Sequence, residues 1–161
     1  MTPPSSEPKI SPEEKIKQLK MVLTEPVPPE GAYVPCVRTG NLLFISGQLP
    51  KVGPNLAYKG RLGKEISLDN GKRAAKQALV NALSVAKWEL KTLDRVKRVV
   101  RLTGYVNSYP GFVDQAKVMD GASEFLGEVF GEAGKHSRVT VGVTDLPLLA
   151  TVEIDLILEV K

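Results

Sequence analysis

Apolar and polar residues alternate along two stretches near the C-terminal end of the chain. In residues 138–143 three valines alternate with arginine, threonine and glycine, and in residues 151–160 five apolar residues alternate with a mostly charged set. Because successive side chains of a strand point to opposite faces, each stretch predicts a β-strand with one apolar face. Leu146-Pro147 separates the two strands, since proline donates no hydrogen bond to a β-ladder.

The apolar faces of these strands predict where their polar side chains point. We expect the valines at 139, 141 and 143 to pack against the protein's own helices, together with the apolar residues of the second strand. One cation and two carboxylates then share the other side of the sheet. The residues on that side are Arg138, Thr140, Glu153 and Asp155.

Two longer stretches carry apolar residues at helical spacing and predict helices with one buried face each. One runs to about Leu90 from Asp69 or Asn70, either of which is a good N-cap, and the other runs from Phe112 to Phe130. The first stripe is rich in alanine, so that helix is expected to lie close on a sheet. The buried stripes are predicted as Ala75, Ala78, Leu79, Ala82, Ala86 and Leu90, and as Val118, Met119, Ala122, Phe125, Leu126 and Val129.

An additional short helix is predicted near the N-terminus. Ser11-Pro12-Glu13-Glu14 fits a capping box with proline at the first helical position. The helix is expected over about residues 11–24, because the prolines at 26, 28 and 29 cannot continue it. Residues 1–10 have the composition of a disordered lead-in.

A hairpin and a further strand complete the predicted elements. Residues 33–38 and 42–46 flank Thr39-Gly40-Asn41, a turn composition that predicts a β-hairpin. Residues 51–66 are predicted to form a loop, and residues 97–107 a strand with basic residues on one face.

The order of these elements is hairpin, helix, strand, helix, strand, strand, which is typical of an α+β fold with a mixed β-sheet. Both long helices are expected on one face of the sheet, which leaves the other face open. An uncovered sheet face is commonly closed by another subunit. Residues 11–161 are expected to form a single domain.

Composition excludes some chemistry. The 161 residues carry a net charge of +4 with a pI near 9.2, which decides neither for anionic small molecules nor for nucleic acid. One cysteine and one histidine cannot form a zinc cluster, and no P-loop or Gly-x-Gly-x-x-Gly sequence occurs, so we expect no metal and no cofactor. No stretch approaches the roughly 18 apolar residues of a membrane span. The chain is expected to be cytoplasmic, without a membrane partner.

Several reactive or charged residues have plain interpretations. Cys36 lies in a predicted strand and is interpreted as a small packing residue, and His136 as a loop residue. Six basic residues are interpreted as a solvated helix end and strand edge, because Glu89 and Asp94 interrupt them. These are Lys87, Lys91, Arg95, Lys97, Arg98 and Arg101.

Arg138 and Glu153 support a chemical hypothesis. A guanidinium can hold a carboxylate through two parallel hydrogen bonds, and a nearby acid can move a proton through water. The alternative is a surface arginine paired with a neighbouring carboxylate, which needs no function. Both residues are expected on the face that meets another subunit, so a cleft formed there would contain both.

Four motifs follow one another along the chain. They are Gly31-Ala-Tyr-Val, Thr39-Gly-Asn-Leu-Leu-Phe-Ile-Ser-Gly-Gln-Leu-Pro50, Gly121-Ala-Ser-Glu-Phe-Leu, and Arg138 followed eight residues later by Leu146-Pro147 and then Val152-Glu153-Ile154. Together with the alanine-rich helix they resemble the RidA/YjgF family of enamine and imine deaminases, also labelled endoribonuclease L-PSP. The resemblance covers about residues 12–161. It is especially similar to the branch with an extra N-terminal helix and the approach Gly131-Glu-Ala-Gly-Lys-His-Ser-Arg138.

The resemblance implies a chorismate-mutase-like fold and a homotrimer with three clefts between subunits. It implies that Arg138 binds the substrate carboxylate and that Glu153 positions or activates the hydrolytic water. The substrate-binding residues it implies are Tyr33, Ser46, Gly47, Asp120, Val139 and Thr140. Thr140 stands where many members have cysteine, so no thiol role carries over. Asp120 stands where asparagine is usual, so a possible amide donor has become an acceptor.

The leading hypothesis is hydrolysis of a 2-aminoacrylate-type enamine, or its imine tautomer, to a 2-keto acid and ammonia. The imine carbon is already electrophilic, so a site that holds the carboxylate and moves protons needs no covalent nucleophile. The expected partner is a small carboxylate-bearing enamine, imine or 2-keto acid. Two alternatives stay open. One is RNA cleavage or binding, against which the absence of an RNP-type motif counts, and the other is a non-catalytic carboxylate-binding regulator.

Overall fold

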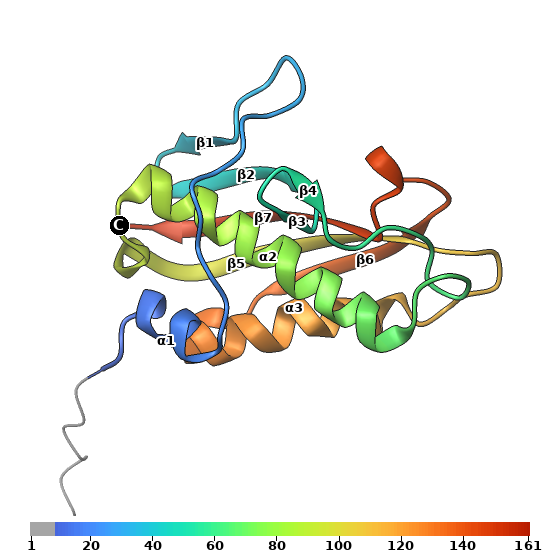
Figure 1. Cartoon of the computed structure of the whole chain (residues 1–161). Helices are drawn as coiled ribbons and strands as arrows, with labels where there is room; N and C mark the ends of the chain where they lie inside the picture. The colour runs from blue at the N-terminus through green and yellow to red at the C-terminus, as the bar shows by residue number, and fades with distance from the viewer. Residues whose placement is uncertain (1–8) are drawn as a thin grey trace, which may run out of the picture.

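The computed structural model describes residues 9–161 and contains a five-stranded sheet with helices on one face (Figure 1). The strand order is β1-β2-β7-β5-β6. Only β5 and β6 pair in parallel, and the other neighbours are antiparallel. The predicted α+β class with a mixed sheet is confirmed. The strands are β1 (Cys36–Thr39), β2 (Leu42–Gln48), β5 (Val96–Asn107), β6 (Ser137–Val143) and β7 (Val152–Val160).

Two long helices, α2 (Leu68–Leu90) and α3 (Gln115–Phe130), cover the same face of the sheet (Figure 1). Every residue of the two predicted apolar stripes is buried. Small residues allow the close packing: a Cβ on Gly121 would overlap the backbone carbonyl of Lys72 on the neighbouring helix. The predicted N-cap of α2 was wrong, because Ser67 Oγ accepts the hydrogen bond of the Asn70 amide at 3.2 Å.

The N-terminal helix α1 (Pro12–Gln18) begins where the capping box predicted, with Ser11 Oγ accepting from the Glu14 amide at 3.2 Å. It ends well before residue 24, and Lys20 adopts a positive φ of 62°. The chain then runs across α2 towards β1 (Figure 1). Of the predicted lead-in, residues 1–8 lie outside the described residues.

The predicted hairpin is confirmed as β1 and β2, joined through Gly40 at a φ of 56°. The stretch 51–66 is less irregular than predicted, because β3 (Lys51–Val52) and β4 (Asn55–Leu56) pair there as a small hairpin. Within residues 9–161, three short 3₁₀ turns complete the fold. They are η1 (Leu93–Arg95), η2 (Gly131–Gly134) and η3 (Pro147–Leu149).

The orientation of β6 corrects one prediction. Leu102 of β5 is buried under the helices and pairs with Arg138, whereas Thr103 pairs with Val139. The side chain of Arg138 therefore lies on the helix face, and Val139 and Val141 are each 40% exposed on the open face. The expectation that these valines face the core was wrong, because β6 is an edge strand whose orientation follows its pairing with β5.

The orientation of β7 is as predicted. The predicted apolar set is buried under the helices, and Glu153 and Asp155 lie on the open face, each partly exposed. The buried set is Val152, Ile154, Leu156, Leu158 and Val160. Arg138 and Glu153 consequently lie on opposite faces of the sheet within one chain.

Candidate active site

An irregularity in β2 determines where Glu153 lies. The pairing of β2 with β7 shifts by one residue between Ile45 and Gln48, so β2 carries a bulge there. A bulge of this kind turns nearby groups out of the regular alternation. It brings Gly47 against Glu153 so closely that a Cβ at position 47 would overlap the carboxylate. Glycine is therefore required at position 47 if Glu153 is to keep its place.

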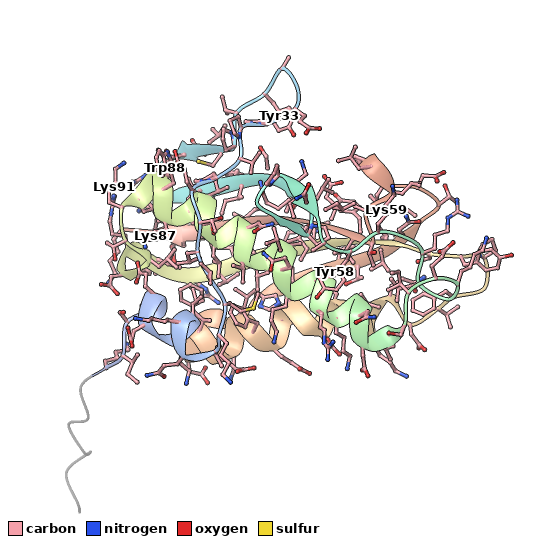
Figure 2. All side chains as sticks on the ribbon, in the orientation of Figure 1. Tyr33, Tyr58, Lys59, Lys87, Trp88 and Lys91 are labelled. Carbon is pink, nitrogen blue, oxygen red and sulfur yellow. The ribbon has the colours of Figure 1, made fainter. Side chains whose placement is uncertain are left out.

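Four predicted site residues, Tyr33, Ser46, Gly47 and Glu153, line one pocket of about 340 Å³. The same four line an adjoining hollow on the uncovered sheet face, so the pocket opens towards that face. Tyr33 projects from the loop before β1 and is 54% exposed (Figure 2). The Ser46 hydroxyl donates to the Val34 carbonyl oxygen at 2.7 Å, which ties this loop to β2.

Much of the remaining wall of the pocket comes from residues 24–30, here called the strap, for which the sequence had predicted no function. The Thr24 amide donates to Ser84 Oγ of α2 at 3.2 Å, and Glu30 Oε1 lies 3.3 Å from Lys51 Nζ. The Lys51 side chain is 16% exposed, so the pocket wall includes a largely buried cation. The signal in the sequence was the run of prolines at 26, 28 and 29, which requires extended chain.

The carboxyl group of Glu153 has a perturbed pKa. Burial raises the pKa of Glu153 above its ordinary 4.5, and the neighbouring Asp155 carboxylate raises it further. Asp155 accepts a hydrogen bond from the Tyr105 hydroxyl at 3.3 Å, and burial followed by the charge of Asp155 raises the pKa of Tyr105. A carboxyl group whose pKa is raised holds a proton more readily than an ordinary carboxyl group, which suits it to take up and return a proton.

Arg138 is held against α3 by one edge of its guanidinium. Nη1 donates to Asp120 Oδ1 at 2.8 Å and to Ser123 Oγ at 3.0 Å, and Nη2 approaches the Ala116 carbonyl oxygen at 3.4 Å. Among the described residues, none accepts a hydrogen bond from Nε. The Arg138 and Asp120 side chains are 23% and 44% exposed, so this ion pair is partly open to water.

The predicted site residues thus form two separate groups. Tyr33, Ser46, Gly47 and Glu153 meet at the pocket, whereas Arg138, Asp120 and Thr140 lie between β6 and α3, and Val139 lies on the open face. Strands β7 and β5 lie between β2 and β6 in the sheet. The expectation that Arg138 and Glu153 look off the same side of the sheet is wrong for a single copy of the chain.

Three further side chains had been singled out from the sequence. Thr140 Oγ1 is buried and has no hydrogen-bond partner within residues 9–161. Cys36 packs against the core, and burial together with Glu89 raises the pKa of its thiol, which disfavours the reactive thiolate. His136 lies in the loop as predicted, and its Nε2 is also 2.9 Å from Ser123 Oγ.

The basic residues at the C-terminal end of α2 include one with a structural role. Arg95 donates to the carbonyl oxygens of Leu90 and Lys161 at 3.2 and 2.9 Å. Beside them Trp88 is 55% exposed, and Lys91 Nζ lies 5.6 Å from the centre of its ring (Figure 2).

In residues 9–161 no group of three or more His, Cys, Asp or Glu side chains is arranged to hold a metal ion. No helix in that range is both long and apolar enough to cross a membrane.

The protein is therefore an α+β protein with a pocket at the bulge of β2. In this pocket lies Glu153, a carboxyl group with a raised pKa. Residues 13–160 match the model of the family described as "YjgF/chorismate mutase-like, putative endoribonuclease", and the chain belongs to this family. The predicted family and its chorismate-mutase-like fold are therefore confirmed.

Individual relatives agree over nearly the whole chain. Protein TCP17 of Trypanosoma cruzi is 40% identical over 147 residues, which cover 91% of this chain and 92% of that protein. The crystal structure of Atu1372 from Agrobacterium tumefaciens is 40% identical, with a TM-score of 0.85 and coverage of 92% and 91%. A 2-iminobutanoate/2-iminopropanoate deaminase of Dermatophagoides farinae is 28% identical over 145 residues, covering 88% and 98%.

Proposed function

We propose that this protein hydrolyses 2-aminoacrylate-type enamines, through their imine tautomers, to 2-keto acids and ammonia without a cofactor. The observation that carries the proposal is the convergence of Tyr33, Ser46, Gly47 and Glu153 at one pocket, with the pKa of Glu153 raised. The deaminase name of the Dermatophagoides farinae relative supports the reaction class.

The proposed reaction needs proton transfers and one water molecule. Protonation of the enamine carbon gives the iminium ion, which is the protonated imine, and its carbon is attacked by water. Glu153 removes a proton from that water as the new C–O bond forms, and the former imine nitrogen becomes an amine. Glu153 then returns the proton to the amine nitrogen of the carbinolamine. The C–N bond breaks to release ammonia, and the hydroxyl oxygen becomes the carbonyl of the keto acid while its proton passes to water. A carboxyl group with a raised pKa is better suited to both proton transfers than an ordinary carboxyl group.

We propose that a second copy of the chain supplies the carboxylate-binding arginine. Arg138 cannot reach the Glu153 pocket of its own chain, because the two lie on opposite faces of the sheet. Apolar side chains are exposed on the open face, and they include Phe44, Val139 and Val141, each 40% exposed. Such exposure favours contact of this face with another protein surface. A contact between the β6 edge of one copy and the pocket face of the next is head-to-tail, and such contacts form a ring when the rotation between copies closes. We propose a homotrimer of this kind.

The activity test uses imines generated in place. A pyridoxal-dependent dehydratase acting on serine or threonine supplies the substrate, and keto-acid formation is measured above the spontaneous rate. Glu153→Gln should lower kcat by about a hundredfold or more. Glu159→Gln is the matched control, because Glu159 lies on the same face of β7 outside the pocket. Equal loss in both variants, or no turnover by the wild type, would overturn the proposal.

A mixing experiment tests whether the site is shared between copies. Glu153→Gln and Arg138→Ala chains, each inactive by themselves, are mixed, unfolded and refolded together. If each site takes Glu153 from one copy and Arg138 from another, about one quarter of the sites regain both residues by random assembly. No regained activity, or a monomer of about 17.5 kDa by light scattering, would contradict the shared site.

The exposed Trp88 supports a second candidate, binding of single-stranded RNA. An exposed aromatic ring with Lys91 beside it, and with Lys87 preceding it on α2, offers stacking and phosphate contacts (Figure 2). The test is binding and cleavage of a labelled single-stranded RNA. This candidate predicts that Trp88→Ala weakens binding while Glu153→Gln does not. Equal binding by Trp88→Ala and the wild type would reject it.

A further inference from the structure

The hydrogen bonds around Arg138 continue to the only histidine of the chain. Arg138 Nη1 donates to Ser123 Oγ at 3.0 Å, and Ser123 Oγ lies 2.9 Å from His136 Nε2. On the other side of the imidazole ring, His136 Nδ1 lies 2.6 Å from the Gly134 carbonyl oxygen. One continuous chain of hydrogen bonds therefore joins η2, the start of β6 and α3.

The direction of each hydrogen bond in this chain follows from donor and acceptor chemistry. The Gly134 carbonyl can only accept, so Nδ1 of His136 carries the hydrogen in the neutral ring. Nε2 is then an acceptor, and the Ser123 hydroxyl must donate to it. With its hydrogen engaged, the Ser123 oxygen presents its lone pairs to the guanidinium of Arg138. The two neighbours of Arg138 Nη1, Ser123 and Asp120, are then both acceptors.

The carbonyl at the start of this chain is held rigidly. Gly134 is buried, and a Cβ there would overlap the backbone carbonyl of Leu126 in α3. The loop before β6 is thus packed directly on the helix that also carries Asp120 and Ser123. A fixed carbonyl orients the imidazole, and the imidazole orients the serine hydroxyl.

We propose that His136 and Ser123 are positioning residues that hold Arg138 in its carboxylate-binding orientation. This inference rests on the proposed function for its activity readout. If His136 no longer accepts from Ser123, the hydroxyl is free to rotate, which turns its hydrogen towards Asp120 and its lone pairs away from Arg138. Arg138 then loses one of the two acceptors that hold Nη1. The exposed edge of the guanidinium would be less well oriented towards a bound carboxylate.

Two substitutions of His136 separate this role from simple anchoring of the loop. Asparagine reproduces the donor at Nδ1 but has no acceptor at the Nε2 position, whereas glutamine reproduces the acceptor. We expect His136→Asn and Ser123→Ala to raise KM by about three- to tenfold with little change in kcat, the size of one hydrogen bond. His136→Gln should keep KM within about twofold of the wild type. If His136 only anchors the loop, His136→Gln should raise KM more than His136→Asn does.

Ser137→Ala is the matched control for local stability of β6. The Ser137 hydroxyl donates to the Val100 carbonyl oxygen at 2.9 Å. This hydrogen bond lies next to the relay, which is the chain of hydrogen bonds from Gly134 through His136 and Ser123 to Arg138, but is not part of it. Ser137→Ala should therefore leave KM unchanged. A rise in KM equal to that of Ser123→Ala would show that loosening the strand is sufficient, and would overturn the proposal.

Nuclear magnetic resonance tests the relay even if the protein does not turn over the imines. Because the chain has one histidine, its ¹⁵N-labelled imidazole gives one assignable pair of nitrogen signals. We expect the Nδ1–H tautomer in the neutral ring of the wild type and of Ser137→Ala. The Nε–H signal of Arg138, assigned by its absence in Arg138→Lys, should broaden in His136→Asn and stay sharp in His136→Gln. The Nε2–H tautomer in the wild type, or an Arg138 signal indifferent to both substitutions, would overturn the inference.

Discussion

Replacing Arg138 by lysine tests how the site would hold a carboxylate. In the structure Nη1 contacts Asp120 at 2.8 Å and Ser123 at 3.0 Å, which anchors one edge of the guanidinium to α3. Nε and Nη2 form the other edge, where the only contact within residues 9–161 is the 3.4 Å approach to the Ala116 carbonyl oxygen. The planar fork can therefore hold the protein with one edge and a carboxylate with the other. A lysine ammonium has a single nitrogen for both tasks.

The size of the effect follows from the hydrogen bonds lost. A hydrogen bond to a charged group contributes roughly 1.5–3 kcal/mol, and each 1.4 kcal/mol is about a factor of ten. Loss of one of two such bonds in Arg138→Lys should lower kcat/KM by about ten- to a hundredfold, and Arg138→Ala should be at least as severe. Stability should change by less than about 1 kcal/mol, because an ion pair as exposed as Arg138 with Asp120 contributes little.

The assay is kcat/KM for keto-acid formation together with thermal unfolding of each variant. Arg73→Lys serves as the control, because Arg73 is exposed on α2 away from the pocket. Wild-type kcat/KM in Arg138→Lys would refute the idea that one edge of the guanidinium binds α3 while the other binds the carboxylate. Loss of the oligomer in both Arg138 variants would instead assign Arg138 to assembly.

Three other expected outcomes follow from the site. Since the pKa of Glu153 is raised, the folded state binds this proton more tightly than the unfolded state, so stability falls as the pH rises from 4.5 through the folded pKa. Glu153→Gln should therefore unfold at a higher temperature than the wild type at about pH 8, with no difference at about pH 3.5, and equal stability at both would contradict the raised pKa. Asp120→Asn removes a negative charge beside Arg138, so it should improve KM for imines with acidic side chains more than for neutral ones; equal effects on both classes would count against the charge argument. Gly47→Ala places a Cβ against the carboxylate of Glu153 and should lower kcat with a smaller effect on KM, and unchanged kcat would show that the carboxylate moves without consequence.

Sequence periodicity predicted the elements whose two faces differ strongly in polarity. The stripes of α2 and α3 and the buried set of β7 lie where the spacing placed them, because a wide apolar stripe can be satisfied only by a core. The capping box at Ser11 and the turn at Gly40 were also readable, since each depends on a few adjacent residues. The motifs that identified the family are likewise short runs of adjacent residues, so they could be recognised without the structure.

The tertiary structure decided which residues face one another. Alternation along β6 states that Arg138 and Val139 point to opposite faces, but pairing with β5 and the acceptors of α3 determine which face each takes. Likewise, no local pattern places the strap over the pocket, since its neighbours Lys51 and Ser84 are distant in the sequence. Polar side chains at an edge strand can be satisfied on either face, so their orientation depends on contacts between segments far apart in the chain.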